Sequence, residues 1–387
     1  MTRRMPNFPM ANVATDETFL RKALELARAG VGLAAPNPYV GAIIVDDAGN
    51  VLGFGTHTYD GVKHAEVLAI DKAGSKAKGA TLYLNLEPCS HQGRTGPCAD
   101  AVIAAGIRRV VACMEDPNPQ VSGKGFERLR KAGVSVASGI LKQEARELNE
   151  AFAKFIRTRV PLVTLKAAMT LDGKIAPPPD NIGVPGWITS ELARSHVQQL
   201  RHGHDAIMVG VGTVLADNPL LTDRSGKPRR RPFLRVVLDS RLRLPLESRV
   251  AQTAHDDLLV LCSFAEQNRM RALQERGIRV EQIAATGDGR PDMQAVMRRL
   301  GETAITSVLI EGGTLVNWAA LAAGVVDKVF LYYAPKILAG TESVPFALGP
   351  GFRRMSDAPR VRDIRFHHFD DEFAVEGYLS NPYGEGN

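Results

Sequence analysis

The stretch of sequence that decides the fold of this chain is HAEVLAI at 64–70, followed by TLYLNLEPCSHQGRTGPCADAVIA at 81–104. It supplies one imidazole, from His64, and two thiols, from Cys89 and Cys98. Histidine and cysteine are ligands that Zn²⁺ prefers, and three protein ligands leave one tetrahedral position open for water. We therefore predict a catalytic zinc site, in which the metal makes water acidic enough to attack as hydroxide near neutral pH.

Local patterns place these ligands at the ends of regular elements. Apolar runs follow His64 and Cys98 and predict two helices, and the segment 81–86 is typical of a buried strand. Helix N-termini stabilise thiolates through the helix dipole. Ordered ligands on matching elements rarely arise by chance, so we favour a metal site over ordinary core and surface residues. Cys113 and Cys262 lie inside apolar segments, which predicts buried strand thiols.

Glu66 gives the predicted site its chemistry. It lies beside the ligand set without belonging to it, which is typical of a general acid and base. A histidine, a nearby glutamate and then two cysteines is the order found in zinc-dependent deaminases of nucleobase-like rings. The sequence thus predicts hydrolytic deamination by zinc hydroxide, with the backbone N–H of Ala65 helping to position the zinc-bound oxygen.

The spacing of the two cysteines departs from the general deaminase pattern. That pattern has two residues between the cysteines, whereas here eight residues lie between them, at 90–97. The loop carries two glycines and the side chains of Arg94 and Thr95, a composition that suits an anion such as phosphate. His91 is a rival zinc ligand, but we expect it to be a loop or substrate contact. A plain surface loop is the alternative.

Composition limits the class of protein. A length of 387 residues suggests two or three domains, and 44% hydrophobic with 23% charged residues is ordinary for a soluble globular protein. The net charge of +6 suits phosphorylated ligands, and the only basic block, at 229–231, is weaker than nucleic-acid binding usually requires. No segment is apolar enough to span a bilayer, and 1–10 do not form a secretory signal. Four cysteines, two assigned to metal, indicate the reducing cytoplasm.

Helical and strand patterns alternate along the chain, which predicts an α/β protein. We place a domain boundary near residue 160, treat 1–14 as a loose tail and expect a proline-rich loop at 176–186. The first domain is expected to have helices at 19–29, from 64, from 98, at 126–132 and at 141–156, and strands at 41–45, 51–55, 81–86, near 110 and at 134–136. The second is expected to have strands at 162–166, 206–209, 234–238, 258–261, 307–310 and 328–333, and helices at 190–201, 268–276, 293–300 and 315–322.

Two sets of motifs resemble the two halves of one known family. The first set resembles the deaminase half of the bifunctional deaminase–reductase of riboflavin biosynthesis: PNPYVG (36–41), HAE (64–66), LEPCSHQGRTGPC (86–98) and DPNP (116–119). The second set resembles its reductase half: LKAAMTLDG (165–173), WITS (187–190), GTVLADNPLLT (212–222) and IEGG (310–313). The long loop between the cysteines is that family's version of the zinc motif. The match covers nearly the whole chain.

The resemblance implies a fold and two activities. It implies a cytidine-deaminase-like three-layer domain at 15–160 and a dihydrofolate-reductase-like domain at 161–387. The first would deaminate 2,5-diamino-6-(5-phosphoribosylamino)pyrimidin-4-one, and the second would use NADPH to reduce the ribose to a ribityl chain. The protein contribution to the second step is binding and orientation of the cofactor. The family also suggests a homo-oligomer.

Two glycine turns follow predicted strands in the second domain, at 210–213 and 311–314. Each runs into a helix, where bare backbone N–H groups bind phosphate. A tight turn without a ligand is the alternative. Neither turn is a full dinucleotide fingerprint, so we do not predict a Rossmann domain.

Matching the motifs residue by residue implies the remaining site. Cofactor contacts are expected from Ala168, Trp187, Thr213, Ser240 and the turn at Gly313. Substrate contacts are expected from Asn37, at the pyrimidine edge, and from Arg94, Thr95, Arg201, Asp217, Leu221, Arg224 and Glu311, with His57 as a weaker candidate. Lys166, Asp217 and Glu311 are the charged residues expected to deliver a proton during ribose reduction, where the alternative is a structural ion-pair network.

Two other functions compete with this interpretation. One is a deaminase of another nucleobase or of a nucleic-acid base, with a reductase-like domain that takes a different substrate. The long cysteine spacing and the lack of a basic stripe disfavour it. The other is a zinc-stabilised binding module, for which Glu66 would be dispensable.

Overall fold

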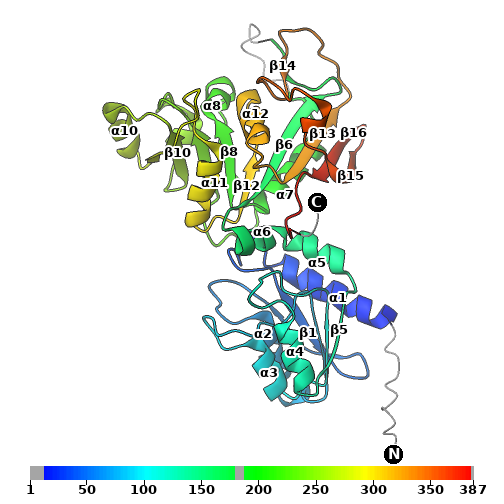
Figure 1. Ribbon diagram of the computed structural model, residues 1–387. Coiled ribbons are helices and arrows are strands. Elements are labelled where there is room, and N and C mark those ends of the chain that lie inside the picture. The colour runs from blue at the N-terminus through cyan, green and yellow to red at the C-terminus, as the bar shows by residue number, and fades with distance from the viewer. Residues whose placement is uncertain (1–12, 179–186, 385–387) are drawn as a thin grey trace, which may run out of the picture. The chain divides into compact units, whose positions relative to one another are not determined.

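The computed structural model describes residues 13–178 and 187–384, so most of the predicted tail at 1–14 and most of the predicted proline-rich loop at 176–186 lie outside the described residues. The chain divides into two compact units, Met1–Ala153 and Lys154–Asn387 (Figure 1). Each unit is built on its own sheet, with helices packed against it. The predicted α/β class is confirmed.

The first unit holds a five-stranded sheet in the order β2-β1-β3-β4-β5. Strands β2, β1 and β3 pair antiparallel, whereas β3, β4 and β5 pair parallel. The elements are α1 (Val13–Arg28), β1 (Gly41–Val45), β2 (Val51–Thr56), α2 (Ala65–Ala73), η1 (Gly74–Ala77), β3 (Thr81–Leu84), α3 (Cys98–Ala104), β4 (Arg109–Ala112), α4 (Lys124–Lys131), β5 (Ser135–Ser138), α5 (Lys142–Leu148) and α6 (Glu150–Thr158), which crosses into the second unit.

Two glycines show that helices cover both faces of this sheet. A Cβ at Gly41 would lie 2.2 Å from the carbonyl oxygen of Ala23 in α1, and a Cβ at Gly55 would lie 2.3 Å from that of Ala65 in α2. Gly55 pairs with Ala42, the neighbour of Gly41, so the two glycines point to opposite faces. Helices α1 and α2 therefore form separate layers with the sheet between them, and the predicted three-layer fold is confirmed.

The helix predicted at 141–156 is broken at Asn149. The structure has α5 before this residue and α6 after it. Asn149 is fully buried, and its side-chain oxygen accepts a hydrogen bond from the Tyr39 N–H at 2.8 Å, while its amide nitrogen donates to the Tyr39 carbonyl at 3.1 Å. This contact between residues distant in sequence ends the first helix, and local periodicity does not reveal it.

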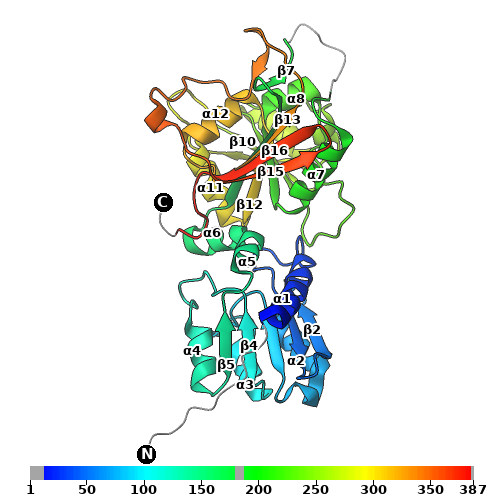
Figure 2. The same cartoon turned by 90° about the vertical axis from the view of Figure 1, so that its right-hand side faces the viewer.

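The second unit holds a nine-stranded sheet in the order β11-β10-β9-β8-β12-β6-β13-β16-β15. Its strands β16 and β15 lie toward the viewer in Figure 2. All neighbours pair parallel from β11 to β13, and the last two strands are antiparallel. The strands are β6 (Leu162–Thr170), β8 (Ala206–Gly210), β9 (Leu234–Leu238), β10 (Leu258–Cys262), β11 (Arg279–Gln282), β12 (Ser307–Ile310), β13 (Lys328–Ala334), β15 (Arg362–Phe369) and β16 (Glu372–Tyr378), besides a small pair of β7 (Lys174–Ala176) and β14 (Val344–Pro345).

Helices also cover both faces of the large sheet. Met208 packs in one apolar core with residues of α11 and α12, whereas its neighbours Ile207 and Val209 pack in another core with residues of α8, α9 and α10. The helices are α7 (Glu191–His202), α8 (Val211–Asp217), α9 (Arg249–Gln252), α10 (Gln267–Gln274), α11 (Met293–Glu302), α12 (Thr314–Ala322) and the short η2 (Met355–Asp357). The strands β11, β15 and β16 and the helices α8 and α9 were not predicted, and β15 lacks a clear strand pattern because it is mostly exposed and polar.

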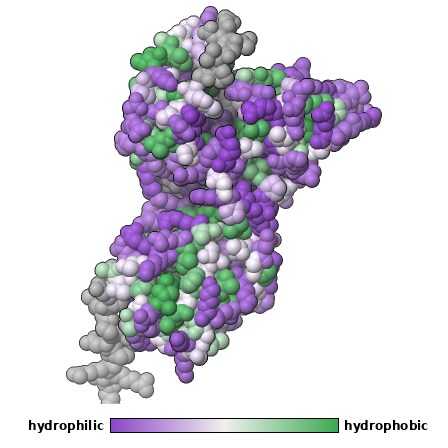
Figure 3. All heavy atoms as spheres, turned by 180° about the vertical axis from the view of Figure 1, so that it is seen from behind, coloured by the Kyte–Doolittle hydropathy of each residue, from purple (hydrophilic) through white to green (hydrophobic). Residues whose placement is uncertain are grey.

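The surface is mostly hydrophilic, with scattered apolar residues on the face drawn in Figure 3. Among the described residues, no helix combines the length and the hydropathy that a bilayer crossing requires.

Candidate active sites

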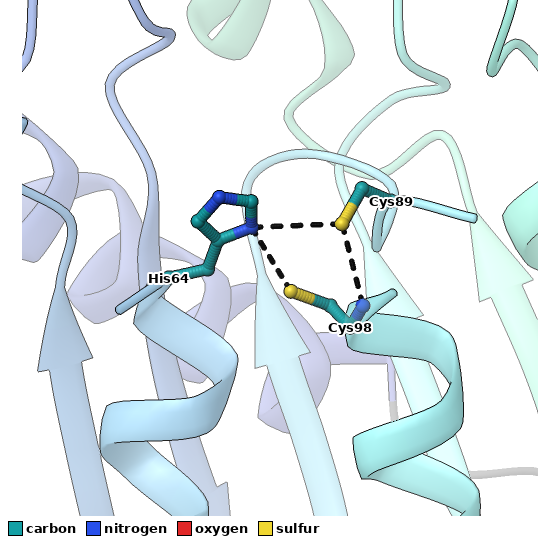
Figure 4. A group of neighbouring side chains, drawn as sticks. All are labelled: His64, Cys89 and Cys98. Carbon is teal, nitrogen blue, oxygen red and sulfur yellow. Dashed lines mark hydrogen bonds between the residues drawn. The ribbon is translucent and has the colours of Figure 1, made fainter. Parts of the chain in front are cut away.

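The three predicted zinc ligands converge in the first unit (Figure 4). His64 is the N-cap residue of α2, Cys98 begins α3, and Cys89 follows β3. The Nδ1 atom of His64 lies 3.1 Å from Cys98 Sγ and 3.5 Å from Cys89 Sγ. The three ligand atoms all lie within 4.8 Å of one another, as a shared tetrahedral metal requires.

The electrostatics of the two thiols fit a cation. The Cys98 thiol and the His64 ring hydrogen-bond to Cys89 and hold the pKa of its thiol well below the usual range. The backbone N–H of Cys98 also donates to Cys89 Sγ at 3.3 Å, at the positive end of α3. The hydrogen bond to Cys89 in turn raises the pKa of His64. A soft divalent metal suits this arrangement of two sulfur atoms and one imidazole.

Glu66 lies in the first turn of α2, beside the ligands, and is only 3% exposed. Burial, and then the charge of Cys89, raise the pKa of its carboxyl to about 7. A carboxyl with a pKa near neutrality both accepts and releases protons at working pH, which a general acid and base must do. A divalent cation bound beside it would lower this pKa.

Asn37 and His57 lie next to the ligand cluster. The Nδ2 atom of Asn37 is 3.0 Å from Nε2 of His57, and the His57 ring lies 5.1 Å from the ring of His64. Nδ1 of His57 is 3.1 Å from the Lys63 carbonyl oxygen, and burial lowers the pKa of this histidine. His57 is therefore already engaged by protein groups at both ring nitrogens.

The side chains of the eight-residue loop between the cysteines differ from one another in exposure and in bonding partners. Arg94 is exposed, lies 4.5 Å over the ring of Tyr59 and donates to its carbonyl at 3.0 Å. Thr95 Oγ1 is buried without a hydrogen-bond partner in the described part of the chain. His91 is exposed and lies outside the group of three ligands.

In the second unit, three charged side chains predicted for the reductase site meet. Arg201 donates from Nε and Nη2 to the two carboxylate oxygens of Glu311, at 2.6 and 3.0 Å, and Lys166 Nζ lies 3.7 Å from the same group. Burial alone would raise the pKa of Glu311, but Arg201 and then Lys166 lower it to about 2. Burial lowers the pKa of Lys166 despite the nearby carboxylate, so Arg201 is the stronger partner of Glu311.

The two glycine turns also come together. Gly210 N–H donates to the Gly312 carbonyl at 3.4 Å, and a Cβ at Gly313 would lie 3.0 Å from Thr213 Oγ1. Gly313 has a φ of 78° and is the N-cap residue of α12, where its lack of a side chain leaves the helix N-terminus uncapped. This arrangement is suited to binding a phosphate through backbone N–H groups.

The predicted substrate segment at 217–224 begins at the last residue of α8 and is held by arginines. Arg201 Nη1 donates to the Thr222 carbonyl at 2.8 Å, and Arg235 Nη1 donates to the Leu220 carbonyl at 3.1 Å. Leu221 lies between them, buried and with a φ of 58°. Arg224 is exposed, and its N–H donates to Gln198.

Asp217 is the third charged residue predicted for ribose reduction. It lies exposed at the end of α8. Within the described residues, it shares no hydrogen bond or ion pair with Lys166, Arg201 or Glu311. The structure therefore joins two of the three residues expected to act in ribose reduction.

The other predicted cofactor contacts lie on separate elements of the second unit. Ala168 lies on β6 opposite Tyr332 of β13. Trp187 is 67% exposed, and the guanidinium of Arg194 lies 4.6 Å over its ring. Ser240 follows β9, and its carbonyl accepts from the Phe264 N–H at 2.9 Å.

Three residues that position the sites were not predicted. Glu87, two residues before Cys89, accepts four backbone hydrogen bonds. Arg235 is 1% exposed inside β9, and Arg229 donates to the carbonyls of His202 and His204 at the end of α7. An arginine inside a strand such as β9 is the one local signal that was available, because buried arginines need partners.

Comparisons with known proteins assign both units. Residues 161–375 match the family model of the RibD C-terminal domain, and residues 13–114 match that of the cytidine and deoxycytidylate deaminase zinc-binding region. The riboflavin biosynthesis protein RibD of Bacillus amyloliquefaciens is 42% identical over 348 residues, which cover 90% of this chain and 92% of that protein.

Two solved structures are similar over nearly their whole length. RibD of Acinetobacter baumannii gives a TM-score of 0.80 at 33% identity, covering 95% of this chain and 99% of that one. A diaminohydroxyphosphoribosylaminopyrimidine deaminase/5-amino-6-(5-phosphoribosylamino)uracil reductase of Thermotoga maritima gives 0.78 at 36% identity, with the same coverage.

Proposed function

This chain belongs to the RibD family of riboflavin biosynthesis proteins, and we propose that each of its two units carries one of the family's two reactions at the residues assembled above. The protein is a bifunctional enzyme, a zinc-dependent deaminase joined to a reductase that uses NADPH. Its substrate is a phosphorylated pyrimidine.

In the first unit, His64, Cys89 and Cys98 hold the metal. When bound there, Zn²⁺ supplies the Lewis acidity that activates water. Glu66 takes a proton from the attacking water at its carboxylate and delivers it to the amino nitrogen that leaves as ammonia. Asn37 contacts the pyrimidine edge, with the His57 ring holding its amide in place.

The loop at 90–97 serves the phosphorylated end of the substrate. Thr95 Oγ1 has no protein partner among the described residues. The Arg94 guanidinium donates one hydrogen bond to the Tyr59 carbonyl, which leaves its other N–H groups for phosphate. The ring of Tyr59 holds the guanidinium plane.

In the second unit, NADPH supplies a hydride when bound, and the protein orients it. Ala168, Trp187, Thr213, Ser240 and Gly313 line the cofactor site. Glu311 and Lys166 face the ribose, where Lys166 is the proton donor because burial has lowered its pKa. Arg201 already donates three hydrogen bonds to Glu311 and Thr222, so the exposed Arg224 is the main contact for the ribose phosphate.

Asp217 and Leu221 complete the substrate site, with Asp217 as a binding residue. We favour this role over a catalytic one because, among the described residues, Asp217 forms no hydrogen bond or ion pair with Lys166 or Glu311. Leu221 shapes the turn that presents Arg224.

Several broader features belong to the same proposal. The domains span 15–160 and 161–387, which the start of the RibD model at 161 and the change of unit at Lys154 both support. The enzyme is a cytoplasmic homo-oligomer that binds no nucleic acid. Two arginines of the basic block, Arg229 and Arg231, donate to carbonyls of their own unit, which supports the last point.

The observation that carries the proposal is the convergence of His64, Cys89 and Cys98 beside the buried Glu66. The test is turnover of the phosphoribosylamino-diaminopyrimidinone by the zinc-loaded chain, followed by mass spectrometry with and without NADPH. We expect the deaminated product alone without NADPH and its ribityl derivative with NADPH. Ammonia release with no NADPH-dependent product would contradict the assignment of the second unit.

A further inference from the structure

Glu87 is a buried carboxylate that binds only backbone. It is 2% exposed and stands two residues before Cys89. Its Oε2 accepts from the N–H groups of Asp116 and Gly123, at 3.0 and 2.9 Å, and its Oε1 accepts from those of Gly125 and Phe126, at 2.7 and 3.1 Å. Among the described residues, no basic side chain forms an ion pair with Glu87.

These four bonds compensate for burial of the charge. A buried carboxylate is costly unless hydrogen bonds replace its hydration, and bonds to a charged acceptor are stronger than neutral ones. Glu87 also lies at the N-terminus of α4, whose N-cap residue Gly123 has no side chain to cap it. The carboxylate therefore supplies the missing cap and meets the positive end of the helix dipole.

Gly125 shows how closely α4 approaches the ligand segment. A Cβ at Gly125 would lie 2.1 Å from the Pro88 carbonyl oxygen and 3.0 Å from Glu87 Oε1. Any larger residue would push the Pro88–Cys89 peptide away from the helix. Two contacts thus hold the backbone around Cys89. One is the close approach of α4 to Pro88, and the other is the Ala99 N–H, which donates to the Cys89 carbonyl at 3.1 Å.

We propose that Glu87 is a positioning residue that holds the Cys89 segment against the first turn of α4 and thereby sets the geometry of the metal site. The inference rests on the proposed metal-binding role of Cys89. The same carboxylate fixes the backbone of Asp116, so it ties two loops that flank the ligand cluster to one helix end. Within the described part of the chain it forms no hydrogen bond with the side chains of the metal ligands, and it acts through the Pro88–Cys89 backbone.

Glu87→Gln in the full chain tests this proposal. Glutamine has nearly the same shape, but its amide nitrogen would face two N–H donors, so two of the four bonds become repulsive. Substituting a residue that holds a metal ligand in place typically lowers metal affinity 10- to 100-fold. We expect chelator competition to show a loss of zinc affinity in that range, and the absorption spectrum of the Co²⁺-substituted protein to shift in its thiolate and d–d bands.

The control is Asp46→Asn. Asp46 also accepts backbone hydrogen bonds, from Ala48 and Asn50 in the β1–β2 turn of the same unit, but it shares none with the ligand segment. The Asp46→Asn substitution should change zinc affinity by no more than about twofold and should leave the cobalt spectrum unchanged. NADPH-dependent reduction by the second unit should be unaffected in both variants.

A Glu87→Gln variant that is less stable but keeps wild-type zinc affinity and cobalt spectrum would overturn the proposal, because a merely structural role moves stability alone. If Glu87→Gln does not fold, Glu87→Asp is the variant that tests the proposal, since it keeps the carboxylate on a shorter side chain. A shifted cobalt spectrum in the folded aspartate variant supports the proposal, and an unchanged one contradicts it. Failure of the wild-type chain to show thiolate–cobalt bands would instead contradict the metal assignment itself.

Discussion

Replacing Glu311 by glutamine should destabilise the second unit, because Glu311 compensates two buried cations. Its side chain is 9% exposed, and those of Lys166 and Arg201 are 13% and 12% exposed. Glutamine keeps the shape but removes the charge, so both cations lose their counter-ion. Breaking a buried ion pair by removing one partner is strongly destabilising.

The pKa of Glu311 gives the magnitude. It falls from 4.5 to about 2 in the folded protein, and each pH unit of difference is worth about 1.4 kcal/mol. The carboxylate thus contributes about 3 kcal/mol to the free energy of unfolding at neutral pH. Since its pKa is lowered on folding, this contribution is complete above pH 4.5 and is lost as the pH falls toward 2.

Tryptophan fluorescence in urea is a selective assay. The chain has two tryptophans, Trp187 and Trp318, and both belong to the second unit. The control is Glu281→Gln, which removes a carboxylate from a similar bidentate pair with Arg299 (2.6 and 3.2 Å) that is about one-third exposed. Exposed pairs contribute about 1 kcal/mol or less.

At pH 7 we expect the free energy of unfolding to fall by about 3 kcal/mol in Glu311→Gln and by less than about 1 kcal/mol in Glu281→Gln. The Glu311 difference should shrink as the pH is lowered below 4.5. Equal effects of the two substitutions, or a Glu311 effect that does not change with pH, would show that the cluster is not held by this charge.

Three further predictions concern the same two units. Cys89→Ser should lose zinc in equilibrium dialysis yet bind NADPH like the wild type, since the cofactor site is in the other unit; zinc retained at full affinity would exclude Cys89 as a ligand. Lys166→Met should slow reduction on the order of 100-fold while leaving deamination unchanged. The free energy of unfolding of the second unit should stay near the wild-type level, because the Glu311–Arg201 pair remains. His204, whose pKa burial lowers to about 4, should make the second unit lose stability as the pH falls from 6.5 toward 4, and His204→Gln should flatten that part of the urea midpoint profile.

The sequence was sufficient for the parts of the fold that local periodicity encodes. The strands at 234–238 and 307–310 are found where they were expected, because each is a short apolar run between turns. Helices α2 and α3 begin at the predicted metal ligands for a related reason, since an apolar helical face follows each one. The local signal and the tertiary environment agree at these places.

Features that depend on contacts between distant residues were not predictable in the same way. Asn149 interrupts a regular helical pattern because it binds Tyr39, 110 residues away. The basic block at 229–231 resembles a surface patch in sequence, whereas Arg229 closes the end of α7 and pairs with Asp223. Glu87 has no local signature as a helix cap, because the helix that it caps begins 37 residues later.

The central claim is that one unit deaminates and the other reduces, and Glu66→Gln tests it most directly. The measurement is product analysis by mass spectrometry on the zinc-loaded variant, given either the diaminopyrimidinone or the deaminated intermediate, with NADPH. The account predicts full zinc content, no deaminated product from the first substrate, and reduction of the second at the wild-type rate. Deamination at the wild-type rate, or loss of both reactions in a folded variant, would contradict it.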